Sequence, residues 1–210
     1  MAKQLLVDYL LFDIGQDQIT ESMREHDGKL IVRGILQRAN SKNQNGRIYP
    51  RETLMRESQK YHDTYIKERR ALGELDHPES SVVNLNNVSH NVREMKWQGD
   101  DLLGTVEVLS TPAGNILKEL FKSGIKLGIS SRGLGSVEEI TEADGKDDED
   151  ENPTVKVKDD FELIAFDFVS NPSTHGAFMH PVHESVDKSI SKVNDKDTAV
   201  ENIINDILRG

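Results

Sequence analysis

Two adjacent serines followed by an arginine stand in the glycine-rich stretch Gly-Ile-Ser-Ser-Arg-Gly-Leu-Gly-Ser, residues 128–136. A serine hydroxyl beside a cation and free backbone N–H groups is what acyl transfer requires, because it combines a nucleophile with a place for an oxyanion. If residues 126–131 form a strand, Ser130 and Ser131 point to opposite faces. Ser130 shares its face with Gly128, which leaves room above it, whereas Ser131 shares its face with Ile129; geometry alone gives Ser130 a slight preference as the nucleophile. The alternative is an ordinary strand that ends in a glycine-rich bend.

A histidine that could serve as the base lies upstream, in Gly-Glu-Leu-Asp-His-Pro at residues 73–78. Pro78 disfavours helical geometry for the residue before it, so His77 is expected in an extended loop. An imidazole held there can act as a general base at neutral pH. Glu74 and Asp76 in the same loop are candidates to orient the ring. A surface histidine without a catalytic role is the alternative.

A further acid, Asp167, stands between two phenylalanines in a predicted strand. Its carboxylate is either alone on a polar face or buried and paired, because an unpaired buried charge is costly. A buried acid that accepts a hydrogen bond from a histidine N–H is the third member of a catalytic triad. Asp167 is therefore the third candidate, with Glu74 and Asp76 as alternatives.

The composition excludes several classes of protein. Acidic residues outnumber basic ones, 37 to 26, which argues against a nucleic-acid-binding protein. There is no cysteine, so neither a disulfide framework nor a thiol nucleophile is available. No apolar run reaches the roughly 18 residues of a membrane span, and the first residues lack the pattern of a signal peptide. We expect a soluble, cytoplasmic protein without a cofactor.

Hydrophobic periodicity predicts the elements that must position these residues. Strands are expected at 4–14, 29–36, 82–92, 94–98, 102–109, 126–137 and 154–169. Helices are expected from Pro50 onward and from Pro112 to Gly124, since proline suits the first helical turn. The predicted fold class is α+β, with a mixed or antiparallel sheet closed into a barrel and two or three helices outside it.

The predicted domains are a core over residues 1–181 and a tail over 182–210. Residues 182–198 are polar and unpatterned, which is typical of a linker. Residues 199–208 carry a short amphipathic pattern and predict a helix that docks on its own core or on a partner.

Five motifs together indicate a family. They are His-Asp-Gly-Lys at 26–29, Asn-Gly-Arg-Ile-Tyr-Pro at 45–50, Gly-Glu-Leu-Asp-His-Pro at 73–78, the serine stretch at 128–136 and Asp-Phe-Val-Ser-Asn-Pro-Ser at 167–173. In this order they resemble the prohead maturation proteases of T-even-type tailed bacteriophages, over about residues 25–181. The fold of that family is similar to that of the herpesvirus assemblins. The resemblance therefore implies an assemblin-like, mainly antiparallel β-barrel wrapped by a few helices.

The resemblance also implies an activity. It is that of a serine endopeptidase that cuts scaffold or core proteins and the major capsid protein inside the immature head, in the host cytoplasm. Ser130 becomes the nucleophile, His77 the general base and Asp167 the third member, where the herpesvirus enzymes use a second histidine. Backbone N–H groups near Arg132 and Gly133 would stabilise the oxyanion, with the Arg132 cation as a second option. Neither nucleic acid nor a membrane is implied as a partner, and homo-oligomerisation stays open.

The family resemblance further implies cleavage after glutamate in short Leu/Ile-x-Glu sites. Ile-Thr-Glu ending at Glu142 fits that form, and Val-His-Glu ending at Glu184 nearly does. Both are candidate self-cleavage sites. Glu142 lies in the insert 138–151, which holds nine acids against one lysine and is otherwise read as a solvated loop.

Two rival interpretations remain. The first is a catalytically inactive capsid-assembly or scaffolding protein that keeps a protease-like core. The second is a metal-dependent hydrolase, which would use His77, Asp76 and the histidines at 175, 180 and 183. No cysteine supports a metal site and the spacing matches no helical motif, so no metal is predicted.

Overall fold

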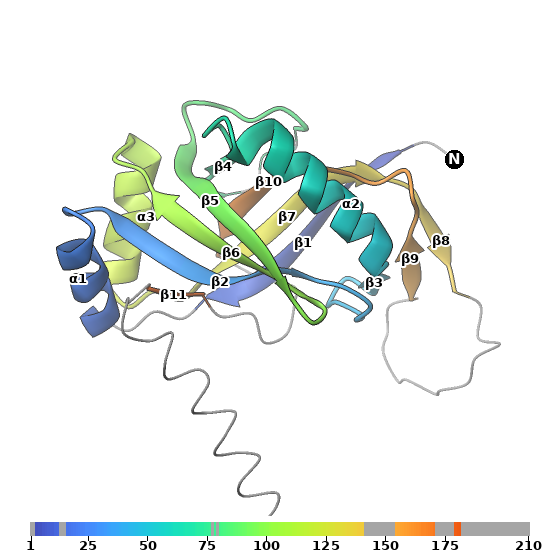
Figure 1. Cartoon of the computed structure of the whole chain (residues 1–210), viewed down its shortest axis with the longest axis horizontal. Helices are drawn as coiled ribbons and strands as arrows, with labels where there is room; N and C mark the ends of the chain where they lie inside the picture. Colours follow the sequence, from blue (N-terminus) through green and yellow to red (C-terminus); the bar gives the residue numbers. More distant parts are fainter. Residues whose placement is uncertain are drawn as a thin grey trace, which may run out of the picture.

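The computed structural model describes residues 3–12, 16–76, 78, 80–140, 154–170 and 179–181 (Figure 1). The helices are α1 (Gln16–Glu25), α2 (Arg51–Tyr61), its π-helical continuation η1 (His62–Ile66) and α3 (Pro112–Lys122). The strands are β1 (Gln4–Phe12), β2 (Leu30–Arg38), β3 (Arg47–Ile48), β4 (Leu72–Glu74), β5 (Val88–Gln98), β6 (Asp101–Val108), β7 (Leu127–Gly135), β8 (Val137–Glu139), β9 (Val155–Val157), β10 (Glu162–Val169) and β11 (Met179–Pro181).

The two predicted helices are confirmed, and their ends follow from local chemistry. Pro50 precedes α2 with a φ of −60°, the value that its ring favours. Thr111 caps α3, because its Oγ1 accepts a hydrogen bond from the backbone N–H of Gly114 at 3.0 Å. Gly124 follows α3 with a φ of +73°, so the helix ends where the sequence predicted.

The described strands form three sheets. The sheet that carries the serine stretch has the order β1-β7-β10 and is antiparallel throughout; we call it the serine sheet. A five-stranded sheet has the order β11-β2-β6-β5-β4, and a small one the order β3-β9-β8. The α+β class with mainly antiparallel strands is thus confirmed, and β3–β9 is the one parallel ladder among the described strands.

The predicted closed barrel is wrong for the described strands, whose ladders form no closed sheet. The two larger sheets meet where β4 approaches β10, through a bridge between Leu75 and Phe168 and a 2.8 Å hydrogen bond from the Asp76 N–H to the Phe168 carbonyl. At the other side β11, and not β1, pairs with β2, over residues 32–34.

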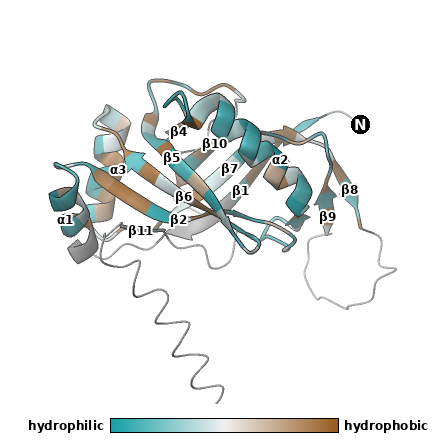
Figure 2. Cartoon of the chain, viewed as in Figure 1, coloured by the Kyte–Doolittle hydropathy of each residue, from teal (hydrophilic) through white to brown (hydrophobic). Residues whose placement is uncertain are grey.

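The core lies between the serine sheet and the five-stranded sheet, and hydrophobic residues follow the strands in Figure 2. Phe166 and Phe168 of β10 face this core, where Tyr61 of α2 packs edge-on against Phe166 and Phe121 of α3 against Phe168. Burying each such ring contributes about 1.5–3 kcal/mol. Because side chains alternate along a strand, the residue between the two rings, Asp167, points to the opposite face.

Replacing Gly73 in β4 with alanine is expected to destabilise the fold by about 3 kcal/mol. An added Cβ would lie 1.9 Å from the Phe166 carbonyl oxygen and 2.2 Å from Nε2 of His90, and the backbone oxygen cannot move aside alone. Urea denaturation of the variant and wild type measures the difference. Gly99→Asn is the control: no atom lies within 4 Å of that position, and asparagine accepts its φ of +58°. Equal losses for both variants would contradict the expectation.

Two further sequence-based predictions concern membrane-spanning segments and the C-terminal tail. No helix in the described part of the chain is long and apolar enough to cross a membrane. The tail predicted for 182–210, with its linker and amphipathic helix, lies outside the described residues.

Candidate active site

The two serines of β7 point to opposite faces of the serine sheet, as predicted. Ser131 faces the core, where its Oγ accepts a 2.8 Å hydrogen bond from Nε2 of the buried Gln37. Ser130 lies opposite Asp167 in the register between β7 and β10, so the two side chains share the other face. We call this the site face. The Ser130 side chain is buried there, and its Oγ donates to the Ser131 carbonyl at 3.3 Å.

A buried charge cluster lies next to Ser130 on the site face. The Arg132 Nε lies 2.9 Å from Asp167 Oδ2, and its Nη2 donates to Asp167 Oδ1 at 3.2 Å and to Glu74 Oε1 at 3.0 Å. Asp167 Oδ1 also accepts a hydrogen bond from the backbone N–H of Glu74 at 3.0 Å. None of the three side chains is exposed to solvent. The structure therefore brings together three residues that the sequence indicated only separately.

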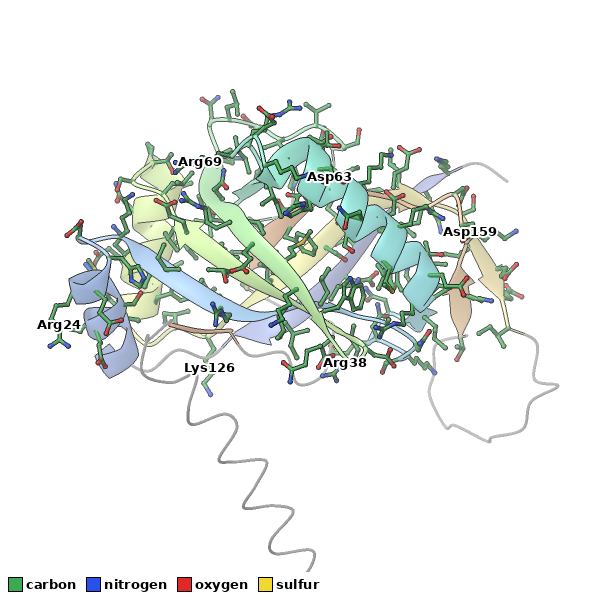
Figure 3. The ribbon with its side chains drawn as sticks, viewed as in Figure 1. Arg24, Arg38, Asp63, Arg69, Lys126 and Asp159 are labelled. Atoms are coloured by element: carbon green, nitrogen blue, oxygen red, sulfur yellow. The ribbon has the colours of Figure 1, made fainter. Side chains whose placement is uncertain are left out.

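Three of the charged residues that Figure 3 labels show how unusual this burial is. Arg24, Asp63 and Asp159 lie on the outside of the molecule (Figure 3), with 76%, 45% and 88% of their side chains exposed. Exposed ion pairs contribute little to the stability of a fold, whereas removing one partner of a buried pair strongly destabilises it.

The chain on both sides of His77 is anchored at this cluster. Before it, Glu74 is held by Arg132, and the Asp76 N–H donates to the Phe168 carbonyl at 2.8 Å. After it, the Ser80 carbonyl accepts a 2.7 Å hydrogen bond from Arg132 Nη1. The side chain of Asp76 is exposed, so it does not join the cluster.

Three predicted site residues lie outside the described residues. They are His77, Glu142 and Glu184. The described residues contain no group of three histidine, cysteine, aspartate or glutamate side chains that could hold a metal ion.

Arg132 and Gly133, the predicted oxyanion residues, lie in the middle of the central strand of the serine sheet. Both pair with β1 and with β10. A bulge in β10 between Leu163 and Ala165 interrupts the ladder at this point. Bulges are common beside active sites, where they redirect backbone groups. The Arg132 guanidinium itself is engaged by two carboxylates and a carbonyl.

His90, which no sequence motif singled out, is buried where β4, β5 and β10 meet. Its Nε2 lies 2.8 Å from the Phe166 carbonyl and its Nδ1 2.8 Å from Ser89 Oγ. The carbonyl can only accept, so Nε2 carries the proton and Nδ1 accepts from the serine hydroxyl. Burial lowers the pKa of His90 to about 4, partly opposed by the nearby Asp167. The one sequence signal for a buried His90 is its position between Val88 and Val92 on the same face of a predicted strand.

Stability is expected to fall as pH falls from about 6.5 to about 4, because of His90. Its folded-state pKa lies below the unfolded value, so the contribution is complete above pH 6.5. Below that pH the unfolded chain binds a proton that the folded chain excludes. The loss amounts to about 3 kcal/mol. Urea denaturation between pH 7.5 and 4, for wild type and His90→Gln, measures it. An identical pH slope in both proteins would contradict the assignment.

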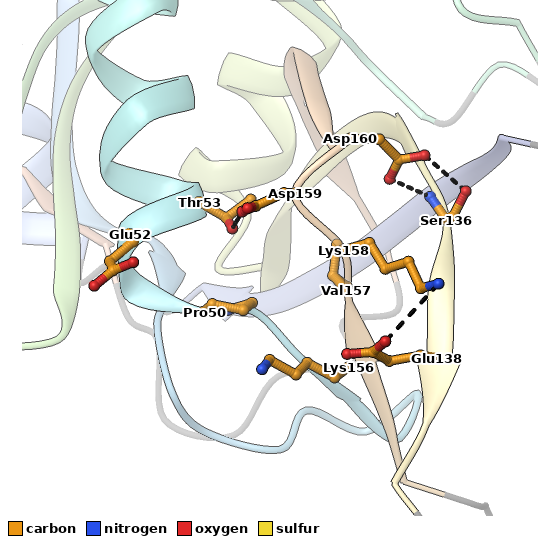
Figure 4. A pocket seen from close by; sticks show the side chains of 10 residues that line it. All are labelled: Pro50, Glu52, Thr53, Ser136, Glu138, Lys156, Val157, Lys158, Asp159 and Asp160. Atoms are coloured by element: carbon orange, nitrogen blue, oxygen red, sulfur yellow. Dashed lines mark hydrogen bonds and ion pairs between the residues drawn. The ribbon is translucent and has the colours of Figure 1, made fainter.

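A polar pocket of about 600 Å³ lies between the start of α2 and strands β8 and β9 (Figure 4). Thr53 Oγ1 donates to Asp159 there at 2.8 Å, and Ser136 Oγ donates to Asp160 at 2.7 Å. Ser136 stands six residues beyond Ser130 on extended chain, about 20 Å away. The pocket is therefore separate from the site face.

Comparisons with known proteins show which family the chain resembles. The model of a family described as prohead core protein serine protease matches residues 14–187. The prohead core protein protease of Enterobacteria phage T4 is 32% identical over 129 residues, 57% of this chain and 61% of that protein. The chain thus matches less than two thirds of this curated relative.

A solved structure shares the fold. The bacteriophage T4 capsid assembly protease, gp21, aligns with a TM-score of 0.66 at 24% identity, over 81% of this chain and 99% of that chain. The family match spans every element of the site face, from β4 to β7 and β10. The chain therefore belongs to the prohead core protein serine protease family.

Proposed function

We propose that this chain is a serine endopeptidase that processes scaffold or core proteins and the major capsid protein inside the phage prohead, in the host cytoplasm. The observation that carries the proposal is the site face. Ser130 stands opposite Asp167 there, and Arg132 holds the chain on both sides of His77 against the same face. The family membership and the names of the T4 relatives support a protease of capsid assembly.

The proposed reaction is acyl transfer. His77 takes the proton of Ser130 Oγ, which attacks the scissile carbonyl and forms a tetrahedral intermediate. Collapse of this intermediate breaks the C–N bond, and the proton passes from His77 to the leaving amine. Water, activated by the same histidine, then hydrolyses the acyl-enzyme and releases Ser130.

Two further groups complete the proposed mechanism. Backbone N–H groups near Arg132 and Gly133 are the proposed oxyanion donors; both residues pair with β1 and β10, so this role requires the ladder to open locally when substrate binds. Asp167 orients the His77 ring and offsets the imidazolium charge. Glu74 is the alternative orienting acid, because it belongs to the same buried cluster. Asp76 is disfavoured by its exposed side chain.

The proposed substrates carry glutamate before the cleaved bond, in Leu/Ile-x-Glu sites, and Glu142 and Glu184 are proposed self-cleavage sites. Incubating the protein with a peptide that contains Ile-Thr-Glu, read by mass spectrometry, tests this specificity. Cleavage after glutamate is expected, and the matched Ile-Thr-Gln peptide should stay intact. Equal cleavage of both peptides would reject the proposed specificity. The intact mass of the incubated protein tests self-cleavage at the same time.

The second candidate function is a capsid-assembly or scaffolding protein without activity. The burial of Ser130 favours this second function, because a substrate can reach the hydroxyl only if the residues that bury it move. An absence of cleavage in both the isolated protein and assembled proheads would support this alternative.

A further inference from the structure

Arg132 connects three separate parts of the chain from one buried position. Its Nη2 reaches Glu74 at the end of β4, its Nε and Nη2 reach Asp167 of β10, and its Nη1 reaches the Ser80 carbonyl. Glu74 and Ser80 lie on either side of the residue to which we assign the base. A single guanidinium thus fixes both ends of this short segment.

The cluster also extends to the rest of the loop. Glu74 Oε1, which Arg132 holds, accepts a 3.0 Å hydrogen bond from the Asn84 N–H. The Leu75 N–H donates to the Asn87 carbonyl at 3.0 Å, which closes the loop beyond it. The Arg132–Glu74 contact is therefore one of the links that tie Glu74 and Asn84 to β7, beside the hydrogen bond from the Glu74 N–H to Asp167.

The contacts at position 132 fit an arginine side chain and not a lysine side chain. The planar guanidinium presents its donors as a fork and can bind two carboxylates and a carbonyl at once, whereas a lysine ammonium is a compact point charge. One guanidinium faces two carboxylates, so the cluster keeps one negative charge. Glu74 Oε2 is buried without a hydrogen-bond partner in the described part of the chain. This excess negative charge favours a cation forming beside the cluster, as the imidazolium of the proposed reaction does.

We propose that Arg132 is a positioning residue, whose guanidinium holds residues 74–84 in register with Ser130 on the site face. The proposal rests on the proposed function, because that function gives this segment the general base. The Arg132 side chain touches no reacting atom in this assignment, and the oxyanion role proposed above belongs to its backbone N–H group. A misplacement of about 1 Å in a catalytic group lowers the rate by about 10²-fold.

Arg132→Lys tests the proposal, with Arg47→Lys as its matched control. Arg47 also binds an aspartate, Asp8, through Nη1 at 3.0 Å, but Asp8 stands opposite Ser131 and faces away from the site. In Arg132→Lys we expect amide hydrogen exchange at Leu75 and Asn84 to be at least about tenfold faster, with unchanged exchange in β2 and β6. We expect kcat to fall about 10²-fold with KM within about threefold. Arg47→Lys should leave both readouts at the wild-type values.

The outcomes separate this proposal from the proposed function. Wild-type exchange at Leu75 and Asn84 in Arg132→Lys would overturn the positioning role, whatever the activity. Faster exchange with unchanged kcat would overturn it as well. If the wild type cleaves nothing, either isolated or in assembled proheads, the proposed function fails and the exchange rates alone decide the positioning role. If Arg132→Lys does not fold, Glu74→Gln removes one anchor with little change in volume, and the same localised exchange is expected.

Discussion

Replacing Ser130 with alanine is expected to lower kcat by at least about 10⁴-fold while the protein folds normally. The hydroxyl is the proposed nucleophile, so without it no acyl-enzyme forms on this residue. The hydrogen bond from Ser130 Oγ to the neighbouring Ser131 carbonyl, at 3.3 Å, is long and contributes little to stability. Hydrolysis of the Ile-Thr-Glu peptide and urea denaturation measure the two effects on one preparation.

Ser131→Ala is the matched control for this experiment, since it removes the same group from the opposite face. It leaves the buried Gln37 amide without its 2.8 Å acceptor and is expected to destabilise the fold by about 1–3 kcal/mol. Its kcat should stay within about tenfold of wild type. An inactive Ser131→Ala together with an active Ser130→Ala would reverse the assignment of the nucleophile.

Replacing Arg132 with methionine is expected to lower the free energy of unfolding by about 3–5 kcal/mol. The substitution leaves the carboxylates of Glu74 and Asp167 buried together without their cation. Two such charges cannot be hydrated where they lie, and they repel each other. Urea denaturation at pH 7 measures the loss.

The double variant Arg132→Met, Glu74→Gln separates charge from packing. It removes one of the two carboxylates, so it should be more stable than Arg132→Met by at least about 1 kcal/mol. If Arg132 stabilises the fold through the packing of its aliphatic stem and not through its charge, Glu74→Gln will lower the free energy of unfolding further. A double variant less stable than Arg132→Met would therefore contradict the charge cluster as the cause.

The local part of the site could be predicted from the sequence. Strand alternation places Ser130 and Ser131 on opposite faces, and the structure confirms this. The two phenylalanines around Asp167 left a choice between a polar face and a buried pair, and the structure shows the buried pair. Both predictions depend only on residues adjacent in the chain, because side chains along a strand alternate between its two faces.

The long-range part could not be predicted. The partners of Arg132 lie 58 residues upstream at Glu74 and 35 residues downstream at Asp167, and no local pattern encodes that pairing. Strand β4 has three residues and β3 has two, too few for a periodic signal. The barrel prediction was wrong for the described strands: β1 and β2 belong to separate sheets, and the neighbour of β2 at its edge is β11, a three-residue strand that the sequence did not predict.

Helix α1 was missed for a different reason. Its sequence, Gln-Asp-Gln-Ile-Thr-Glu-Ser-Met-Arg-Glu, is mostly polar. Over residues 19–25, where burial is described, Ile19 and Ser22 are buried and Glu21 and Met23 are half-buried. Ser22 is buried with its Oγ donating to the Ile31 carbonyl at 2.9 Å. A buried serine on a helix face is not distinguished from a surface serine by hydrophobic periodicity.

Covalent labelling of the active serine tests the central claim most directly. The wild-type protein and the His77→Ala variant are treated with a fluorophosphonate probe, digested and mapped by mass spectrometry. A serine nucleophile activated by a histidine predicts one adduct on Ser130 in wild type and labelling at least about 10²-fold slower in His77→Ala. An adduct on Ser131 or elsewhere, or equal labelling of both proteins, would contradict the account.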